Sequence, residues 1–375
     1  MANKPGKWLK ALFLIVLPIG LVAASCTSPP RGWPGPTVAQ DTIYVSTVDG
    51  RVLALDPTDG GRRWEYAIAA PGEAGFLSCG PAPSTMRFYA VPAVGGGRVY
   101  ASTADFERGG GSVYAIDATS GDRIWQFSSN APIVGAPAYQ DGVVYTAGSD
   151  GKLYALDSLN GGVLWTFQAG DKIWSSPAAG SGLVYVGSLD HKLYAVDARM
   201  GTLRWSFEAG GFITSAPALA GGTVFFGAAD RKLYALDAVQ GTQIWQFQAD
   251  NWFWAPPLIS EGKVYAASLD KKLYALDAAN GQQIWARPFV ADSPISVPVA
   301  LVEGMLIVAS SEGKVYGLDA RTAELKWGQP VNIGQPVMAA PQVWNGTAYV
   351  SGQDGTLYAL RARSGTIQWR IPTKQ

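Results

Sequence analysis

Cysteine and histidine are almost absent from this sequence. Its 375 residues include two cysteines, Cys26 and Cys79, and one histidine, His191. Disulfide frameworks and Cys/His metal sites need more of these residues than the chain contains. His191 falls in a repeated turn where sister copies carry glycine, arginine or lysine, so we interpret it as a turn residue. The sequence predicts no catalytic residue, no metal ligand, no cofactor-binding residue and no internal disulfide.

Net charge is absent too. The chain has 29 basic and 29 acidic residues. This balance argues against nucleic acid as a partner and gives no general attraction to an anionic membrane surface. Glycine (45), tryptophan (14) and tyrosine (16) are abundant. Such a mixture is typical of short strands joined by tight turns, and not of a disordered polymer.

The N-terminal segment has the pattern of a secretory signal. Three lysines precede an apolar run over residues 11–24, which is too short for an ordinary transmembrane helix. The run ends in LVAASC, and the small residues before Cys26 resemble a bacterial lipobox, whose cysteine is diacylated. On this resemblance residues 1–26 are a lipoprotein signal peptide and residues 27–35 a tether, anchored without spanning the membrane. The alternative is an ordinary signal peptide cleaved nearby, with Cys26 incidental.

One frame, A-x-D-x-x-x-G-x-x-x-W, recurs through the chain. Six copies are complete, copy seven has Gly317 and Ala323 in the alanine and glycine slots, and copy eight has Arg361 in the aspartate slot. Successive tryptophans are 61, 40, 40, 40, 40, 42 and 42 residues apart. The copies end at Trp64, Trp125, Trp165, Trp205, Trp245, Trp285, Trp327 and Trp369.

A unit of this length holds four short strands, A to D. In the third copy these lie near APAY, VVYTAG, KLYALD and VLWTFQ. Strands B and C are nearly continuous apolar runs, so both faces of each small sheet must be covered. This predicts an all-β fold over residues 36–371, an eight-bladed β-propeller of four-stranded antiparallel blades. In the frame, Asp accepts backbone N–H groups in the C–D turn, Gly permits positive φ, and Trp fills the gap between blades.

The frame resembles the tryptophan-docking repeat of quinoprotein dehydrogenases and related PQQ-like propellers. Those enzymes use adjacent cysteines, which this chain lacks. With its lipobox, the chain is similar to the BamB-type propeller lipoproteins of the outer-membrane assembly machinery. That resemblance implies a non-catalytic, lipid-anchored protein-binding scaffold of the cell envelope, with an envelope or outer-membrane protein as its partner. The alternatives are a PQQ-binding redox protein and a lipoprotein that binds a ligand or polysaccharide.

Departures from the repeat indicate where a partner binds. Alternating strand directions place the D–A loops and B–C turns on one face, and both long insertions, before Pro92 and in TADFERGGGS, fall there. Aromatics near the strand-A proline also fall on this face, and packing against one another at the channel mouth is the alternative to exposure. The slot three residues before that proline holds Trp33, Tyr89, Val134, Trp174, Thr214, Trp254, Ile295 and Met338. The predicted partner-binding residues are Trp33, Tyr89, Trp174, Trp252, Phe253 and Trp254.

Overall fold

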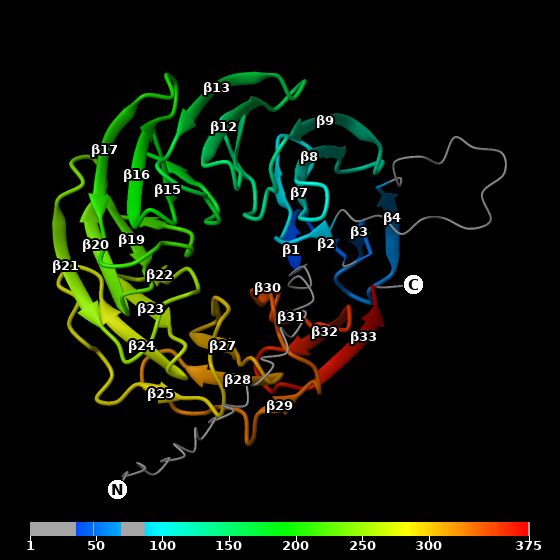
Figure 1. The fold of residues 1–375 in the computed structure, drawn as a ribbon. Coiled ribbons are helices and arrows are strands. Elements are labelled where there is room, and N and C mark those ends of the chain that lie inside the picture. The colour runs from blue at the N-terminus through cyan, green and yellow to red at the C-terminus, as the bar shows by residue number, and fades with distance from the viewer. Residues whose placement is uncertain (1–34, 48, 69–86, 374–375) are drawn as a thin grey trace, which may run out of the picture. The chain divides into compact units, whose positions relative to one another are not determined.

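A computed structural model describes residues 35–47, 49–68 and 87–373. The predicted signal peptide with Cys26, the tether as far as residue 34, Trp33 and Cys79 lie outside these residues. In the described part every regular element is a β-strand, and the strands form eight successive antiparallel sheets. The sheets follow one another around a ring, as Figure 1 shows. This confirms the predicted all-β, eight-bladed β-propeller.

Within the described residues, seven blades contain four strands that pair in sequence order. Blade 1 comprises β1 (Pro36–Ala39), β2 (Thr42–Ser46), β3 (Arg51–Leu55) and β4 (Arg62–Ala67). Blade 3 comprises β10 (Ala138–Gln140), β11 (Val143–Ala147), β12 (Lys152–Asp157) and β13 (Val163–Gln168). Blade 4 comprises β14 (Ala178–Gly180), β15 (Leu183–Gly187), β16 (Lys192–Asp197) and β17 (Leu203–Glu208). Blade 5 comprises β18 (Ala218–Ala220), β19 (Thr223–Gly227), β20 (Lys232–Asp237) and β21 (Gln243–Gln248).

The last three blades follow the same order. Blade 6 comprises β22 (Leu258–Ser260), β23 (Lys263–Ala267), β24 (Lys272–Asp277) and β25 (Phe289–Val290). Blade 7 comprises β26 (Ala300–Val302), β27 (Met305–Ala309), β28 (Lys314–Asp319) and β29 (Val331–Asn332). Blade 8 comprises β30 (Gln342–Trp344), β31 (Thr347–Ser351), β32 (Thr356–Arg361) and β33 (Ile367–Pro372).

Blade 2 departs from the four-strand plan because its innermost strand is split. Two short strands, β5 (Arg87–Phe88) and β6 (Ala93–Gly95), both pair with β7 (Arg98–Asp105). The sheet continues with β8 (Gly110–Asp117) and β9 (Arg123–Ser129). The insertion TADFERGGGS lengthens the β7–β8 hairpin, and β5 pairs with the added part of β7. The added hairpin therefore holds the chain just ahead of strand A against blade 2.

The outer strands of blades 6 and 7 are interrupted. In these blades only β25 and β29, of two residues each, pair with strand C, and a single bridge precedes each of them. The interruptions contain Pro288 and Pro330, which have no N–H to donate to a ladder. The two extra residues that lengthen these tryptophan spacings to 42 therefore lie in the outer strand.

The turns divide between two faces, as the alternating strand directions predict. In blade 3 the C–D turn donates to the A–B turn, from the Ser158 N–H to the Gly142 carbonyl at 3.0 Å. On the opposite face, the Gly170 N–H of a D–A loop donates to Asp190 Oδ2 of the next B–C turn at 2.9 Å. His191 lies in that B–C turn, exposed and with a φ of 72°. The structure thus places the histidine in a surface turn.

Each apolar cluster of the core joins two neighbouring blades. One cluster, for example, combines Tyr145 and Leu153 of blade 3 with Val184 and Tyr194 of blade 4. The strand faces are consequently buried against neighbours and not within a blade. A blade on its own would leave these faces in water, so the blades depend on one another for stability.

The docking tryptophans reach from one blade to the next. Trp165 donates its indole N–H to the Ala198 carbonyl at 3.0 Å, and its ring covers Gly201 of the same turn. Gly201 has a φ of 70°, and a Cβ there would lie 2.7 Å from the indole. Glycine is needed both for the left-handed backbone and for the close approach. The same indole-to-carbonyl bond is made by Trp64, Trp125, Trp205, Trp245, Trp285 and Trp327.

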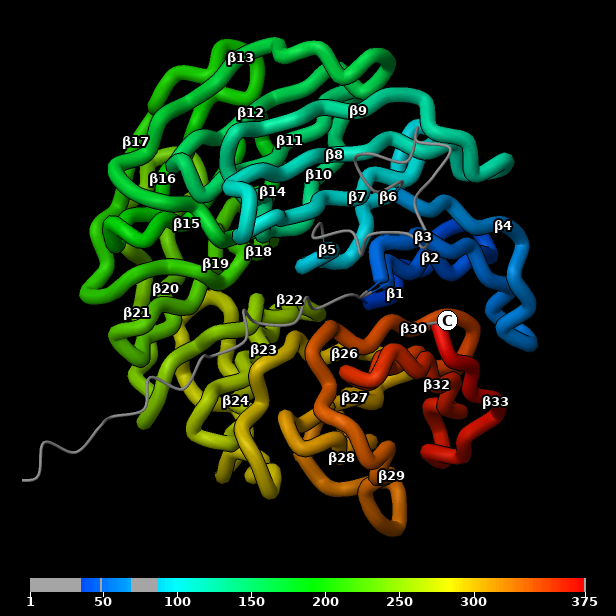
Figure 2. Tube along the Cα trace, turned by 45° about the vertical axis from the view of Figure 1, so that its right-hand side comes forward, coloured from blue at the N-terminus to red at the C-terminus, as the bar shows by residue number. Residues whose placement is uncertain are grey.

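Blade 8 meets blade 1 without any exchange among the described strands. Apolar residues of both blades form one cluster that includes Ile43, Leu55, Tyr349 and Leu357. The Tyr349 hydroxyl donates to the Pro57 carbonyl at 3.0 Å. In Figure 2 the N-terminal and C-terminal blades accordingly lie side by side.

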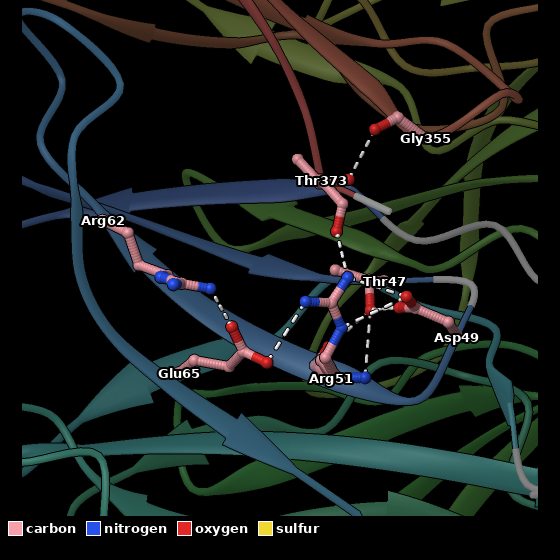
Figure 3. A network of polar contacts seen from close by, with 7 residues as sticks. All are labelled: Thr47, Asp49, Arg51, Arg62, Glu65, Gly355 and Thr373. Carbon is pink, nitrogen blue, oxygen red and sulfur yellow. Dashed lines mark hydrogen bonds and ion pairs between the residues drawn. The ribbon is translucent and has the colours of Figure 1, made fainter. Parts of the chain in front are cut away.

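A buried arginine completes this seam, as Figure 3 shows. Arg51 donates to Asp49 Oδ2 at 2.7 Å, to Glu65 Oε1 at 3.1 Å and to the Thr373 carbonyl at 2.8 Å. Thr373 is itself held by a hydrogen bond from its hydroxyl to the Gly355 carbonyl at 2.6 Å. Because Arg51 is only 8% exposed, its guanidinium depends on these acceptors. Arg51 thus adds to the apolar cluster a polar link between blade 1 and the end of blade 8.

Candidate functional site

A cavity of about 190 Å³ lies on the channel axis, on the face of the D–A loops and B–C turns. Seven blades contribute to its wall, each through the residues just before strand A. Side chains there alternate between the channel and the blade interior, because the extended chain has a period of two. The first tier of the wall holds Tyr89, Val134, Trp174, Thr214, Trp254, Ser296 and Met338, and the second holds Val91, Ala136, Ser176, Ala216, Pro256, Pro298 and Ala340. We call this space the mouth cavity.

Large aromatic side chains dominate part of the first tier. Trp174 is 36% exposed and donates its indole N–H to Ser149 Oγ at 3.2 Å, while Trp254 is half-buried. Tyr89 is 5% exposed, and burial raises the pKa of its phenol above the usual range, so it is neutral at physiological pH. Most side chains of the second tier are small, and this leaves space beneath the aromatic rings of the first tier.

Two of the residues that we expected at the channel mouth are buried in the core between blades. Phe253 is 2% exposed and belongs to the core between blades 5 and 6, so its prediction as a surface contact is wrong. It occupies the alternate position that Ile133, Ile173 and Ile213 occupy in sister blades, all fully buried. Ile295 is also buried, and Ser296 takes its place in the wall.

The Ile295 error has a simple origin. In blade 7 the position directly before strand A, held by proline in most sister blades, is occupied by Val299, and Pro298 stands one residue earlier. Counting three residues back from Pro298 therefore shifts the phase by one. In an extended chain a shift of one residue moves a side chain to the other face.

Trp252 lies on the mouth face but outside the wall of the mouth cavity. It is 37% exposed, and its ring packs edge-on against Phe212 with the centroids 5.2 Å apart. Phe106 was not singled out from the sequence. It lies at the tip of the β7–β8 hairpin, is 42% exposed and packs edge-on against Tyr89 at 5.3 Å. The signal for it was the insertion itself, which carries a single aromatic residue on the face where the mouth opens.

Repeated contacts hold the loops around the mouth in place. The Tyr194 hydroxyl donates to Asp190 Oδ2 at 2.5 Å, and the same oxygen accepts the Gly170 N–H. Burial, together with this bond to a carboxylate, raises the pKa of Tyr194 to about 12. The same tyrosine–aspartate pair recurs at Tyr154–Asp150, Tyr234–Asp230 and Tyr274–Asp270. Side chains on these loops are therefore presented from a fixed backbone.

The wall of the mouth cavity is uncharged in the described part of the chain. It contains no lysine, arginine, aspartate, glutamate, histidine or cysteine. No group of three or more potential metal ligands occurs among the described residues. An anionic quinone such as PQQ would be removed from water here without a counter-charge, at high cost. These residues do not fit that cofactor.

The geometry defines a class of protein, a tryptophan-docked, PQQ-like β-propeller with an uncharged mouth cavity. A family model described as "Outer membrane protein assembly factor BamB" matches residues 26–105, 80–206, 210–288 and 290–375. The chain belongs to this family. No curated protein shows significant sequence similarity to it. Among the described residues, no helix is long and apolar enough to cross a membrane.

Solved structures share the fold. BamB from Moraxella catarrhalis is 22% identical with a TM-score of 0.64, over 76% of this chain and 85% of that one. The computationally designed Ika8 protein is 15% identical with a TM-score of 0.72, over 88% and 96%. A europium-containing methanol dehydrogenase is 14% identical with a TM-score of 0.66, over 87% and 81%. At these identities the likeness establishes the fold alone.

Proposed function

We propose that this chain is a non-catalytic scaffold of the cell envelope that holds an envelope or outer-membrane protein at the mouth cavity. The proposal extends to this chain the assembly role in its family's description. The observation that carries it is an uncharged cavity whose rim presents Trp174 and Trp254 from rigid loops. Aromatic side chains in apolar pockets are frequent anchors of protein interfaces.

The proposed partner site combines the cavity with the hairpin beside it. Tyr89 joins the two, because it lines the mouth cavity and contacts Phe106 of the β7–β8 hairpin. A partner loop that inserts an apolar side chain between Trp174 and Trp254 would exclude water from both indoles. Fixed loops lose little conformational entropy on binding, which favours affinity.

The double variant Trp174→Ala/Trp254→Ala is expected to reduce partner capture at least about tenfold, as loss of two anchors does. Capture is measured by crosslinking in intact cells, followed by quantitative mass spectrometry of the crosslinked partner. Trp252→Ala is the matched comparison, because Trp252 is 37% exposed against 36% for Trp174 and lies on the same face but outside the cavity wall. As a predicted contact beside the cavity, it is expected to reduce capture less than the double variant does. A double variant that unfolds at the wild-type denaturant concentration and still captures the partner fully would contradict the proposed site.

We also infer that Cys26 carries lipid and anchors the propeller to a membrane. The support is the sequence LVAASC after an apolar run. Cys26→Ser is expected to move the protein from the membrane fraction to the soluble fraction, as measured by fractionation and by mass spectrometry of the N-terminal peptide. Cys79→Ser is the matched control and should stay with the membrane. Retention of Cys26→Ser in the membrane fraction would refute the anchor.

A further inference from the structure

Paired aromatic rings pack between successive blades at six junctions of the described chain. Phe167 of β13, for example, packs against Tyr194 of β16 with the ring centroids 5.4 Å apart. In each case a ring from the outer strand of one blade meets a ring from strand C of the next. The other pairs are Tyr66–Tyr114, Phe127–Tyr154, Phe207–Tyr234, Phe247–Tyr274 and Phe289–Tyr316, with centroids 5.0–6.0 Å apart. Two rings therefore fill this space at most junctions.

The seam between blades 8 and 1 has aliphatic residues in both ring positions. Ile371 of β33 stands where β13 carries Phe167. Leu53 of β3 stands where β16 carries Tyr194. Both aliphatic residues pack in the cluster that joins blades 8 and 1. The junction of blades 7 and 8 keeps the strand-C ring, Tyr358. Among the described junctions, only the seam lacks both rings.

The docking tryptophan at the seam also makes a looser contact than its counterparts do. A Cβ added to Gly60 would lie 3.2 Å from the Trp369 ring, whereas the same distance is 2.5–2.8 Å at the six sister glycines that docking tryptophans cover. The indole N–H of Trp369 is buried and has no hydrogen-bond partner among the described residues. The other seven docking tryptophans each donate to a carbonyl. The seam is therefore less closely packed than the sister junctions.

A cavity of about 380 Å³ lies where the two rings are missing. Leu53 and Ile371 both line it. The rest of its wall is formed by Arg51, Leu55, Gly60, Arg62, Pro372 and Thr373. We call this space the seam cavity. The sister junctions show what fills the corresponding space in this protein, namely aromatic rings.

Two arginines in the wall bear on the charge of an occupant. Arg51 and Arg62 both pair with Glu65, as Figure 3 shows, and Arg51 pairs with Asp49 as well. Their charge is already balanced, so an anionic group would find no unpaired cation in this wall. A guanidinium that bonds through its edge can still stack its face on an aromatic ring. The wall therefore favours a neutral aromatic group.

We propose that the seam cavity binds a neutral aromatic ring of the kind found in phenylalanine and tyrosine. The ring takes the place that paired aromatic side chains take at the sister junctions. It contacts blade 1 and blade 8 together, so its binding stabilises the closed seam. The ring belongs either to a free aromatic molecule or to a side chain of a partner protein, and the cavity recognises both by the same chemistry. This site is independent of the one proposed at the mouth cavity.

The test uses p-cresol, which reproduces the side chain of tyrosine. Binding to the wild-type protein is measured by titration calorimetry, and amide hydrogen exchange is followed across residues 367–373. p-Cresol is expected to bind and to slow exchange in this segment, because a ligand that requires the closed seam stabilises it. 4-Methylcyclohexanol has a similar size but no π-face, and is expected to bind about tenfold more weakly. 4-Methylbenzoate is also expected to bind more weakly, since the wall offers its charge no unpaired cation.

Ile371→Phe is expected to fill the seam cavity from within and to weaken p-cresol binding at least about tenfold. Ile367→Phe is the matched control. It makes the same substitution in β33, but Ile367 is 41% exposed and lies outside the wall of the seam cavity. This variant is expected to bind p-cresol like wild type. Trp174→Ala/Trp254→Ala should do so too, which separates the seam cavity from the mouth cavity.

Unchanged exchange across residues 367–373 in the presence of p-cresol would overturn the proposal, and this measurement needs no variant. Equal binding of p-cresol and 4-methylcyclohexanol would overturn the assignment to an aromatic ring. The tripeptide Gly-Tyr-Gly distinguishes the two sources of the ring. If it binds as tightly as p-cresol, the result supports a partner side chain. If p-cresol alone binds, the result supports a free aromatic molecule.

Discussion

Replacing Trp245 with alanine is expected to lower the free energy of unfolding by ~3–5 kcal/mol, the usual cost of truncating a buried aromatic side chain. Trp245 is 7% exposed and packs in the core between blades 5 and 6. Its indole N–H donates to the Ala278 carbonyl at 2.9 Å, and its ring covers Gly281. The variant removes the packing, the hydrogen bond and the contact that keeps water from the turn.

Urea-induced unfolding, followed by circular dichroism, measures this loss. Trp174→Ala is the matched control, because it removes the same side chain from a site that is 36% exposed, and it should cost less than about 1 kcal/mol. A propeller whose blades are stabilised mainly by their neighbours should lose stability wherever a junction is weakened. Equal effects of the two substitutions would show that the indole between blades contributes no more than a surface tryptophan.

Replacing Arg51 with alanine is expected to destabilise the protein by ~3–5 kcal/mol, as the removal of one partner from a buried ion pair does. Arg51 is 8% exposed and is the group through which Asp49, Glu65 and the Thr373 carbonyl are joined. Without it, Asp49 and Glu65 lose a shared cationic partner and the Thr373 carbonyl loses a donor. The junction between blades 8 and 1 should therefore open before the others.

Hydrogen exchange across residues 367–373 measures the opening and should rise by orders of magnitude in Arg51→Ala. Arg62→Ala is the matched control, since Arg62 pairs with the same Glu65 but has a side chain that is 54% exposed. Surface ion pairs of this kind contribute about 0–1 kcal/mol. Should exchange rise uniformly over all eight blades in Arg51→Ala, the seam would not be the weak point of the ring.

The blade architecture could be predicted from the sequence because the same repeat unit occurs eight times. The strands in the third copy, VVYTA, KLYALD and VLWTFQ, have the predicted positions. Because the same pattern of apolar residues recurs in eight copies, the strand positions can be recognised even where a single copy departs from it. Blade 2 is the exception, because its split first strand follows from an insertion that no other copy shares.

The sequence predicted which segments form the channel mouth, but for Phe253 and Ile295 it did not predict correctly which face of the extended chain the side chain occupies. Tyr89, Val134, Trp174, Thr214, Trp254 and Met338 lie in the wall of the mouth cavity. Phe253 and Ile295 do not, and the sequence held the correcting signal. Aligning the isoleucines of the sister blades, in place of the prolines, puts both residues in the buried position. Trp252 is exposed beside the wall, and its ring packs edge-on against Phe212 of the preceding D–A loop.

By itself the sequence determined the number of blades, the order of their strands and the tryptophans between them, since each of these depends on contacts at a fixed spacing. The tertiary structure alone decided how the ring closes. Arg51 and Thr373 are 322 residues apart, and the Tyr349–Pro57 bond spans 292. The Tyr349–Pro57 bond repeats a contact that other blade pairs make, for example Tyr145 with Ala198. The Arg51–Thr373 bond has no counterpart among the described hydrogen bonds, and it depends on the accumulated turn of eight blades to bring the two ends together.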